Sequence, residues 1–156
     1  MAGEFWLNDR QWPTIEPLLP KFAILGSMEF ACKLSGAKVI LVMGHTECGA
    51  IKGAIDNAEL GNLTGLLAKI KPAVAVTTYT GERTSKNYAF VEAVARKNVE
   101  ITIADIRKDT PMLAEMKSND AIKMAGAMYN LETAKFEIVA VITRSHSSCR
   151  RHSLGV

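Results

Sequence analysis

The chain has 156 residues, of which 48% are hydrophobic and 22% charged, and its formal net charge is +3. These values are normal for one soluble globular domain large enough to bury a core. No apolar run approaches the roughly 20 residues that cross a bilayer, which excludes a membrane span. Glu4 and Asp9 interrupt any apolar stretch at the beginning, so we expect no signal peptide. We therefore expect a cytoplasmic protein without membrane contact.

The first segment, residues 1–20, contains both tryptophans and three of the five prolines. Asn8 or Asp9 is a suitable N-cap for a short helix, and Pro20 would end it. We treat residues 1–20 as a separate N-terminal helical segment, residues 21–140 as one α/β domain, and residues 141–156 as a basic tail.

The elements of residues 21–140 alternate between helix and strand. Ser27 is a suitable N-cap for a helix that Gly36 would close. The continuous apolar, β-branched run of residues 38–43 predicts a strand buried on both faces. Further helices are predicted from Ala50, from Asn62 and over 87–97, and another from Pro111, with a strand over 99–106 and a hairpin of 122–129 with 135–142. This order predicts a parallel α/β sheet with an antiparallel edge.

A possible metal site lies where the first strong strand ends. Residues 44–50, GHTECGA, offer His45 and Cys48, an imidazole and a thiol that are both good zinc donors. Ligands of open α/β sheets gather at the carboxyl ends of strands, and a helix N-terminus would favour the Cys48 thiolate. Zinc needs four ligands and the motif supplies two, so a buried cysteine beside a capping histidine is the alternative interpretation.

The cysteine count agrees with a metal or an inert thiol rather than a disulfide framework. Cys32, Cys48 and Cys149 make an odd number in a compartment that we expect to be reducing. Cys32 lies on a predicted amphipathic helix and is expected in the core.

Several motifs in order resemble β-class carbonic anhydrases over roughly residues 23–140. They are SMEFA at 27–31, GAKVILVMGHTECGAIKGA at 36–54, GNLTGLL at 61–67, IKPAV at 70–74, and GAMY at 126–129. The resemblance implies reversible hydration of CO2 to bicarbonate, for which zinc lowers the pKa of a bound water. It also implies that His45 and Cys48 are zinc ligands and that the protein is a homodimer or larger.

The sequence departs from that family at its front. Family members carry a Cys-x-Asp-x-Arg segment, whose Cys is the first zinc ligand, on a strand beside the His-bearing strand. No such segment occurs here, and Asn8-Asp9-Arg10 has no cysteine. We therefore expect a truncated sheet, an incomplete zinc site, and weak or lost activity. The strand of residues 39–42 would also lack one neighbour, and its open edge predicts pairing with a second copy or cover from residues 1–20.

The two ends carry separate hypotheses. Residues 5–20 resemble the beginning of certain insertion-sequence transposases, which predicts a gene fusion. The tail contains His146, Cys149 and His152, which could supplement the zinc site if it folded back; an end without a role is the preferred alternative. Its arginines and lack of acids leave an anion or nucleic-acid site as a rival function, and a non-catalytic oligomeric remnant is the other rival.

Overall fold

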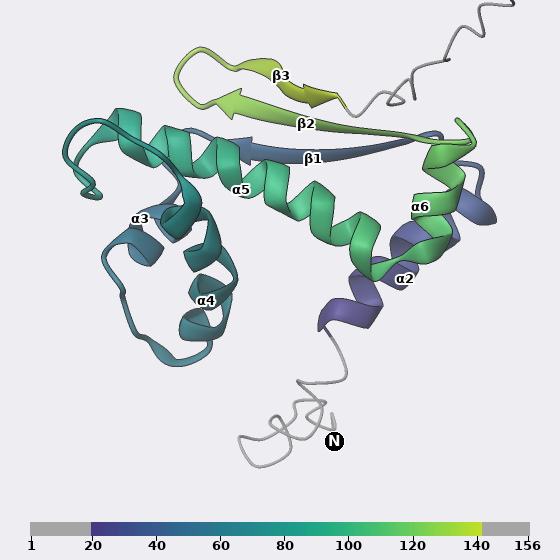
Figure 1. Ribbon diagram of the computed structural model, residues 1–156, viewed down its shortest axis with the longest axis horizontal. Helices are drawn as coiled ribbons and strands as arrows, with labels where there is room; N and C mark the ends of the chain where they lie inside the picture. Colours follow the sequence, from purple (N-terminus) through teal and green to yellow (C-terminus); the bar gives the residue numbers. More distant parts are fainter. Residues whose placement is uncertain (1–19, 142–156) are drawn as a thin grey trace, which may run out of the picture.

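The computed structural model describes residues 20–141, and Figure 1 shows their arrangement. Three strands form one layer and the helices form a second layer against it. The elements in chain order are α2 (Pro20–Lys33), β1 (Val39–His45), α3 (Gly49–Ile55), α4 (Gly61–Val76), α5 (Tyr88–Asp109), α6 (Pro111–Ser118), β2 (Lys123–Asn130) and β3 (Lys135–Val141).

The sheet has the strand order β1-β2-β3. β1 pairs in parallel with β2, from Val39 opposite Lys123 to His45 opposite Tyr129. β2 pairs antiparallel with β3, and their turn is stabilised by Asn130, whose side-chain oxygen accepts the N–H groups of Glu132 and Thr133 at 2.9 Å each. The predicted α/β sheet with an antiparallel edge and a C-terminal hairpin is confirmed.

The prediction of a strand at residues 99–106 is wrong, because these residues form the second half of the 22-residue helix α5. The sequence VEITIADI alternates locally, yet the residues buried along the whole helix recur every three or four positions. They are Phe90, Val91, Val94, Ala95, Val99, Ile103 and Ile106. Tertiary burial of this stripe outweighs the strand preference of the β-branched residues. The parallel partner of β1 is therefore β2, which lies about 80 residues further along the chain.

The predicted start of the first helix at Ser27 is also wrong. α2 begins at Pro20 and continues through Ser27 to Lys33, and Gly36, with φ of 78°, follows in the turn before β1. Proline has a φ suited to a first helical turn, so Pro20 begins a helix where the sequence predicted an end. Cys32 is 3% exposed and belongs to the core, as expected. No helix in residues 20–141 is long and apolar enough to span a membrane.

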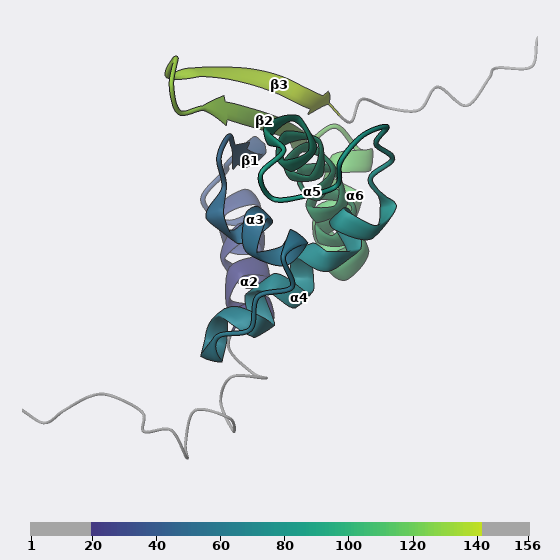
Figure 2. The same ribbon diagram turned by 90° about the vertical axis from the view of Figure 1, so that its left-hand side faces the viewer.

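The helices lie on one side of the sheet, as both ribbon views show (Figures 1 and 2). α5 packs directly against β1 and β2, because Gly44 and Gly126 leave room for Val99 there. The opposite side of the sheet has no cover within the described residues. Its exposed apolar side chains alternate with buried ones along β1 and continue onto β3: Val39 59%, Leu41 49%, Met43 58%, Phe136 66% and Ile138 46% exposed. We call these five residues the open face.

Candidate metal centre

The two predicted zinc donors lie at the two ends of one tight turn between β1 and α3. His45 is the last residue of β1, and Cys48 is the N-cap of α3 with φ −61° and ψ 115°. Glu47 lies between them in the left-handed region with φ of 59°, a conformation that is costly for a residue with a Cβ. The turn lies at the carboxyl end of a parallel strand, where α/β proteins place their ligands.

The imidazole of His45 is oriented by a hydrogen bond to the main chain. Its Nδ1 lies 2.8 Å from the carbonyl oxygen of Thr46, and a carbonyl can only accept, so Nδ1 carries the proton. In the neutral ring this leaves the lone pair on Nε2, the nitrogen that is free to bind a metal. The residue as a whole is exposed, so an ion can reach it.

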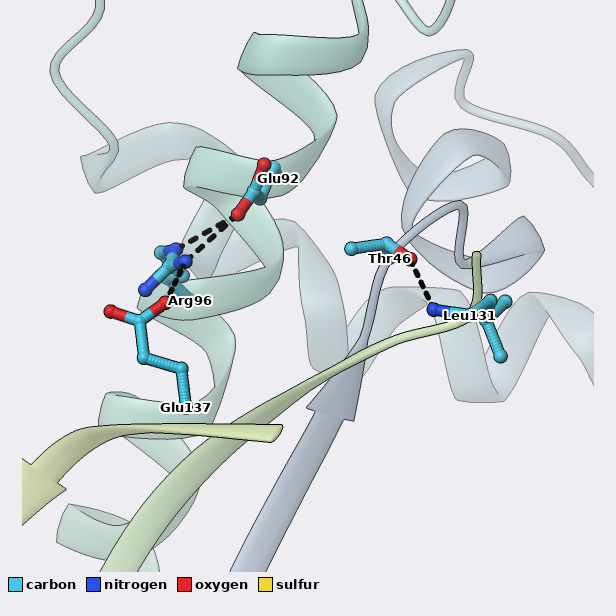
Figure 3. Close-up of polar contacts among 5 residues, drawn as sticks. All are labelled: Thr46, Glu92, Arg96, Leu131 and Glu137. Atoms are coloured by element: carbon cyan, nitrogen blue, oxygen red, sulfur yellow. Dashed lines mark hydrogen bonds and ion pairs between the residues drawn. The ribbon is translucent and has the colours of Figure 1, made fainter. Parts of the chain in front are cut away.

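Thr46 is buried and fastens the turn to the β2–β3 hairpin. Its hydroxyl accepts the N–H of Leu131 at 3.0 Å, and its own N–H donates to the carbonyl of Tyr129 at 3.0 Å. Figure 3 shows the Thr46 hydroxyl directed at the Leu131 amide. Sequence reasoning missed this residue, because residues 99–106 were expected beside β1 in place of β2. The only available signal was a hydroxyl side chain between two metal donors.

Cys48 carries a free, partly buried thiol at the beginning of α3. Its backbone carbonyl accepts the N–H of Lys52 at 3.1 Å, so the residue is continuous with the helix. Lys52 forms an ion pair with Glu47, which connects the first turn of α3 to the left-handed residue. The thiol therefore has a fixed backbone and access to solvent, as a metal ligand requires.

Imidazole and thiol are suitable donors for zinc, but the described part of the chain supplies only two such donors at this turn. Zinc prefers imidazole nitrogen and thiolate sulfur, with four ligands in structural sites and three plus water in catalytic ones. Within residues 20–141 no group of three or more His, Cys, Asp or Glu side chains is placed to hold a metal. The other candidates, His146, Cys149 and His152, lie outside the described residues. His45 and Cys48 thus fit half of a zinc shell.

A separate charged group connects α5 with β3. Arg96 donates to Glu92 at 2.9 Å and to Glu137 at 2.7 Å (Figure 3). The hydrogen bond from Arg96 and its positive charge lower the pKa of the Glu137 carboxyl. The pKa of Arg96 is raised, chiefly by the same hydrogen bond, so the guanidinium stays charged. These ion pairs connect the hairpin to the helix layer.

A mixed sheet with an imidazole and a thiol at the carboxyl end of β1 defines a candidate zinc protein of α/β class. The family model described as carbonic anhydrase matches residues 12–136. The chain belongs to the carbonic anhydrase family, and its fold is that of solved β-class structures. The match begins before residue 20, so part of the segment assigned to a foreign source also aligns with the family. The transposase resemblance of residues 5–20 stays a prediction.

Known relatives agree with this family. Carbonic anhydrase 2 of Mycobacterium tuberculosis is 25% identical over 114 residues, which are 72% of this chain and 54% of the relative. The carbonic anhydrase of Mycolicibacterium smegmatis is 25% identical over 129 residues, 80% of this chain and 57% of the relative. The chain therefore spans a little over half the length of these relatives.

Solved structures agree on the fold. A Coccomyxa β-carbonic anhydrase in complex with acetazolamide has a TM-score of 0.66 at 17% identity, covering 79% of this chain and 56% of that one. One of two tetrameric β-carbonic anhydrases from Sordaria macrospora has a TM-score of 0.63 at 19% identity, covering 77% and 61%.

Proposed function

We propose that the chain is a β-carbonic anhydrase relative that binds zinc through His45 and Cys48 and hydrates CO2 far more slowly than its longer relatives. The observation that carries the proposal is the position of these two residues, at the carboxyl end of β1 and the N-cap of α3, inside the family match. When bound, zinc would supply a Lewis acid that lowers the pKa of a coordinated water to near neutrality.

The residues of the turn have distinct roles in this proposal. His45 presents Nε2 as a neutral donor because its Nδ1–H is bonded to Thr46. Cys48 presents a thiolate, which balances one charge of the ion. Tyr129 is the register partner of His45 on β2, and Phe136 is the partner of Tyr129 on β3. This row puts two aromatic residues in register with His45, and in this proposal they supply apolar surface for CO2.

Two protein donors hold zinc less tightly than a complete shell. Zinc bound to four protein ligands contributes about 10–16 kcal/mol in small zinc domains. With half of those ligands, we expect a dissociation constant on the order of micromolar or weaker. When zinc is scarce, a loosely held ion would lower the rate further, because every empty site is inactive.

A non-catalytic oligomer is the second candidate, and the open face favours it. Val39, Leu41 and Met43 are each about half exposed or more on a strand whose second edge is unpaired within residues 20–141. An unpaired apolar edge strand is a template for another chain. Self-association is compatible with either candidate, so zinc and activity must separate them.

Stopped-flow CO2 hydration with added zinc tests the proposal. We expect a rate well below that of a longer relative measured in parallel, and Cys48→Ala should remove what remains. A non-catalytic remnant would show no difference in rate between the wild type and Cys48→Ala. A rate equal to that of the relative and abolished by Cys48→Ala would show that the site is complete.

A further inference from the structure

Thr46 differs from its neighbours in the turn between His45 and Cys48, which we call the metal-donor turn. It is 4% exposed, whereas His45 and Glu47 on either side are exposed. It makes two hydrogen bonds to the β2–β3 hairpin, one through its hydroxyl and one through its N–H. The hydroxyl bond to Leu131 joins residues 85 positions apart in the sequence. A residue of the donor turn is thus held by a distant part of the chain.

The same residue carries the acceptor for the histidine ring. The Thr46 carbonyl accepts the Nδ1–H of His45 at 2.8 Å. A hydrogen bond to one ring nitrogen fixes both the tautomer and the ring orientation of a metal-binding histidine. The accepting carbonyl belongs to a residue that the hairpin holds at two points, its N–H and its side-chain hydroxyl. The position of Thr46 on the hairpin therefore influences the direction in which His45 presents Nε2.

We propose that Thr46 is a positioning residue for the metal-binding nitrogen of His45, acting through its hydroxyl bond to the β2–β3 hairpin. This rests on the proposed function, because it takes His45 as a zinc donor. Valine has nearly the shape of threonine but cannot accept the Leu131 N–H. The substitution Thr46→Val leaves that amide without its acceptor, so the turn keeps only its backbone bond to Tyr129 and the ring is held less firmly in one direction.

A buried hydroxyl elsewhere in the chain provides a matched control. Thr77, the C-cap of α4, is 5% exposed, and its hydroxyl donates to the Ala73 carbonyl of that helix at 2.7 Å. Thr77→Val removes a hydroxyl that is similarly buried. The hydrogen bond lost in this variant joins residues only four positions apart in the sequence. Any general loss of stability from removing a buried hydroxyl appears in both variants, whereas a change at His45 appears only in Thr46→Val.

The first experiment measures zinc affinity by competition with a chromophoric chelator, using the wild type, Thr46→Val, Thr46→Ser and Thr77→Val. Loss of an outer partner of a metal ligand typically costs about 10-fold or more in affinity, so we expect about a 10-fold loss in Thr46→Val. Thr46→Ser keeps the acceptor and should bind like the wild type, as should Thr77→Val. Equal affinity in Thr46→Val and the wild type would overturn the proposal while leaving the proposed function intact.

The second experiment needs no metal. Nitrogen-15 NMR of the metal-free chain should show His45 as the single tautomer protonated at Nδ1, and hydrogen exchange should show a protected Leu131 amide. In Thr46→Val we expect a mixture of tautomers and faster exchange of that amide, with Thr77→Val unchanged. An unaltered tautomer in Thr46→Val would overturn the proposal. If His45→Ala binds zinc as well as the wild type, the proposed function fails, and this second readout still decides whether Thr46 positions the His45 ring.

Discussion

Val99 of α5 lies directly over Gly126 of β2. A Cβ added to Gly126 would lie 2.7 Å from Cγ1 of Val99, closer than real side chains approach, and 3.1 Å from Cδ1 of Ile103. The side chains of Val99 and Ile103 therefore reach the backbone of the sheet at this point, because Gly126 has no side chain to keep them away. This contact brings the helix layer close to the sheet.

Gly126→Ala should destabilise the protein by about 1–3 kcal/mol, because an added methyl in a filled core forces neighbouring atoms to shift. Val99 is short and held on a helix, so it cannot move aside as a flexible side chain could. Urea unfolding at neutral pH measures the change.

Gly65→Ala is the matched control for that substitution. Gly65 lies inside α4, and an added Cβ meets nothing within 4 Å. Alanine should therefore stabilise the helix by up to about 1 kcal/mol. The double variant Val99→Ala with Gly126→Ala should recover part of the loss. A Gly126→Ala protein as stable as the wild type would mean that α5 does not lie this close to the sheet.

The Arg96–Glu137 pair should make the free energy of unfolding depend on pH in the acid range. The pKa of Glu137 is lower in the folded chain than in the unfolded one, where a glutamate has a pKa of about 4.3. Its contribution is therefore fully present above that value and lost as the pH falls through the lower, folded pKa. Glu137→Gln should be modestly less stable than the wild type at pH 6, with the difference vanishing at strongly acid pH. In an Arg96→Gln background the same substitution should have no effect, and a persistent difference there would exclude the pair as its cause.

Zinc bound by two donors should be removed readily. We expect mild chelation to strip the metal and Cys48→Ser to lose zinc binding measured by isothermal titration. Cys32→Ala is the matched control, because this thiol is 3% exposed in the core and is unavailable to a metal. Zinc that survives Cys48→Ser would place the metal elsewhere, and dependence on Cys149 or on a tail histidine would assign the tail a role in the site.

The open face should drive self-association. Sedimentation at micromolar concentration should show a homodimer or larger, and Leu41→Lys should shift it to monomer by placing a charge among Val39 and Met43. Leu60→Lys is the control, because Leu60 is 70% exposed at the start of α4, away from the sheet. A monomeric wild type would exclude strand pairing between copies and leave cover by residues 1–20, with Trp6 and Trp12, as the remaining explanation.

The sequence predicted the elements that have a single strong local signal. The run 38–43 has no competing helical pattern, and the Thr110–Pro111 start and the final hairpin carry clear boundary residues. The strand prediction for residues 99–106 failed because β-branched residues favour strands locally. Their burial is decided instead by the sheet against which α5 packs. The donor pair was visible as a motif. The role of Thr46 was not, because it depends on a hydrogen bond to Leu131 across most of the domain.

An anomalous X-ray map at the zinc edge of crystals grown with zinc would show directly whether His45 and Cys48 bind the metal. We expect a peak bonded to Nε2 of His45 and Sγ of Cys48, with waters or other small ligands in the remaining positions. A peak surrounded by four side chains of one chain, or no peak at this turn in fully zinc-loaded protein, would contradict it.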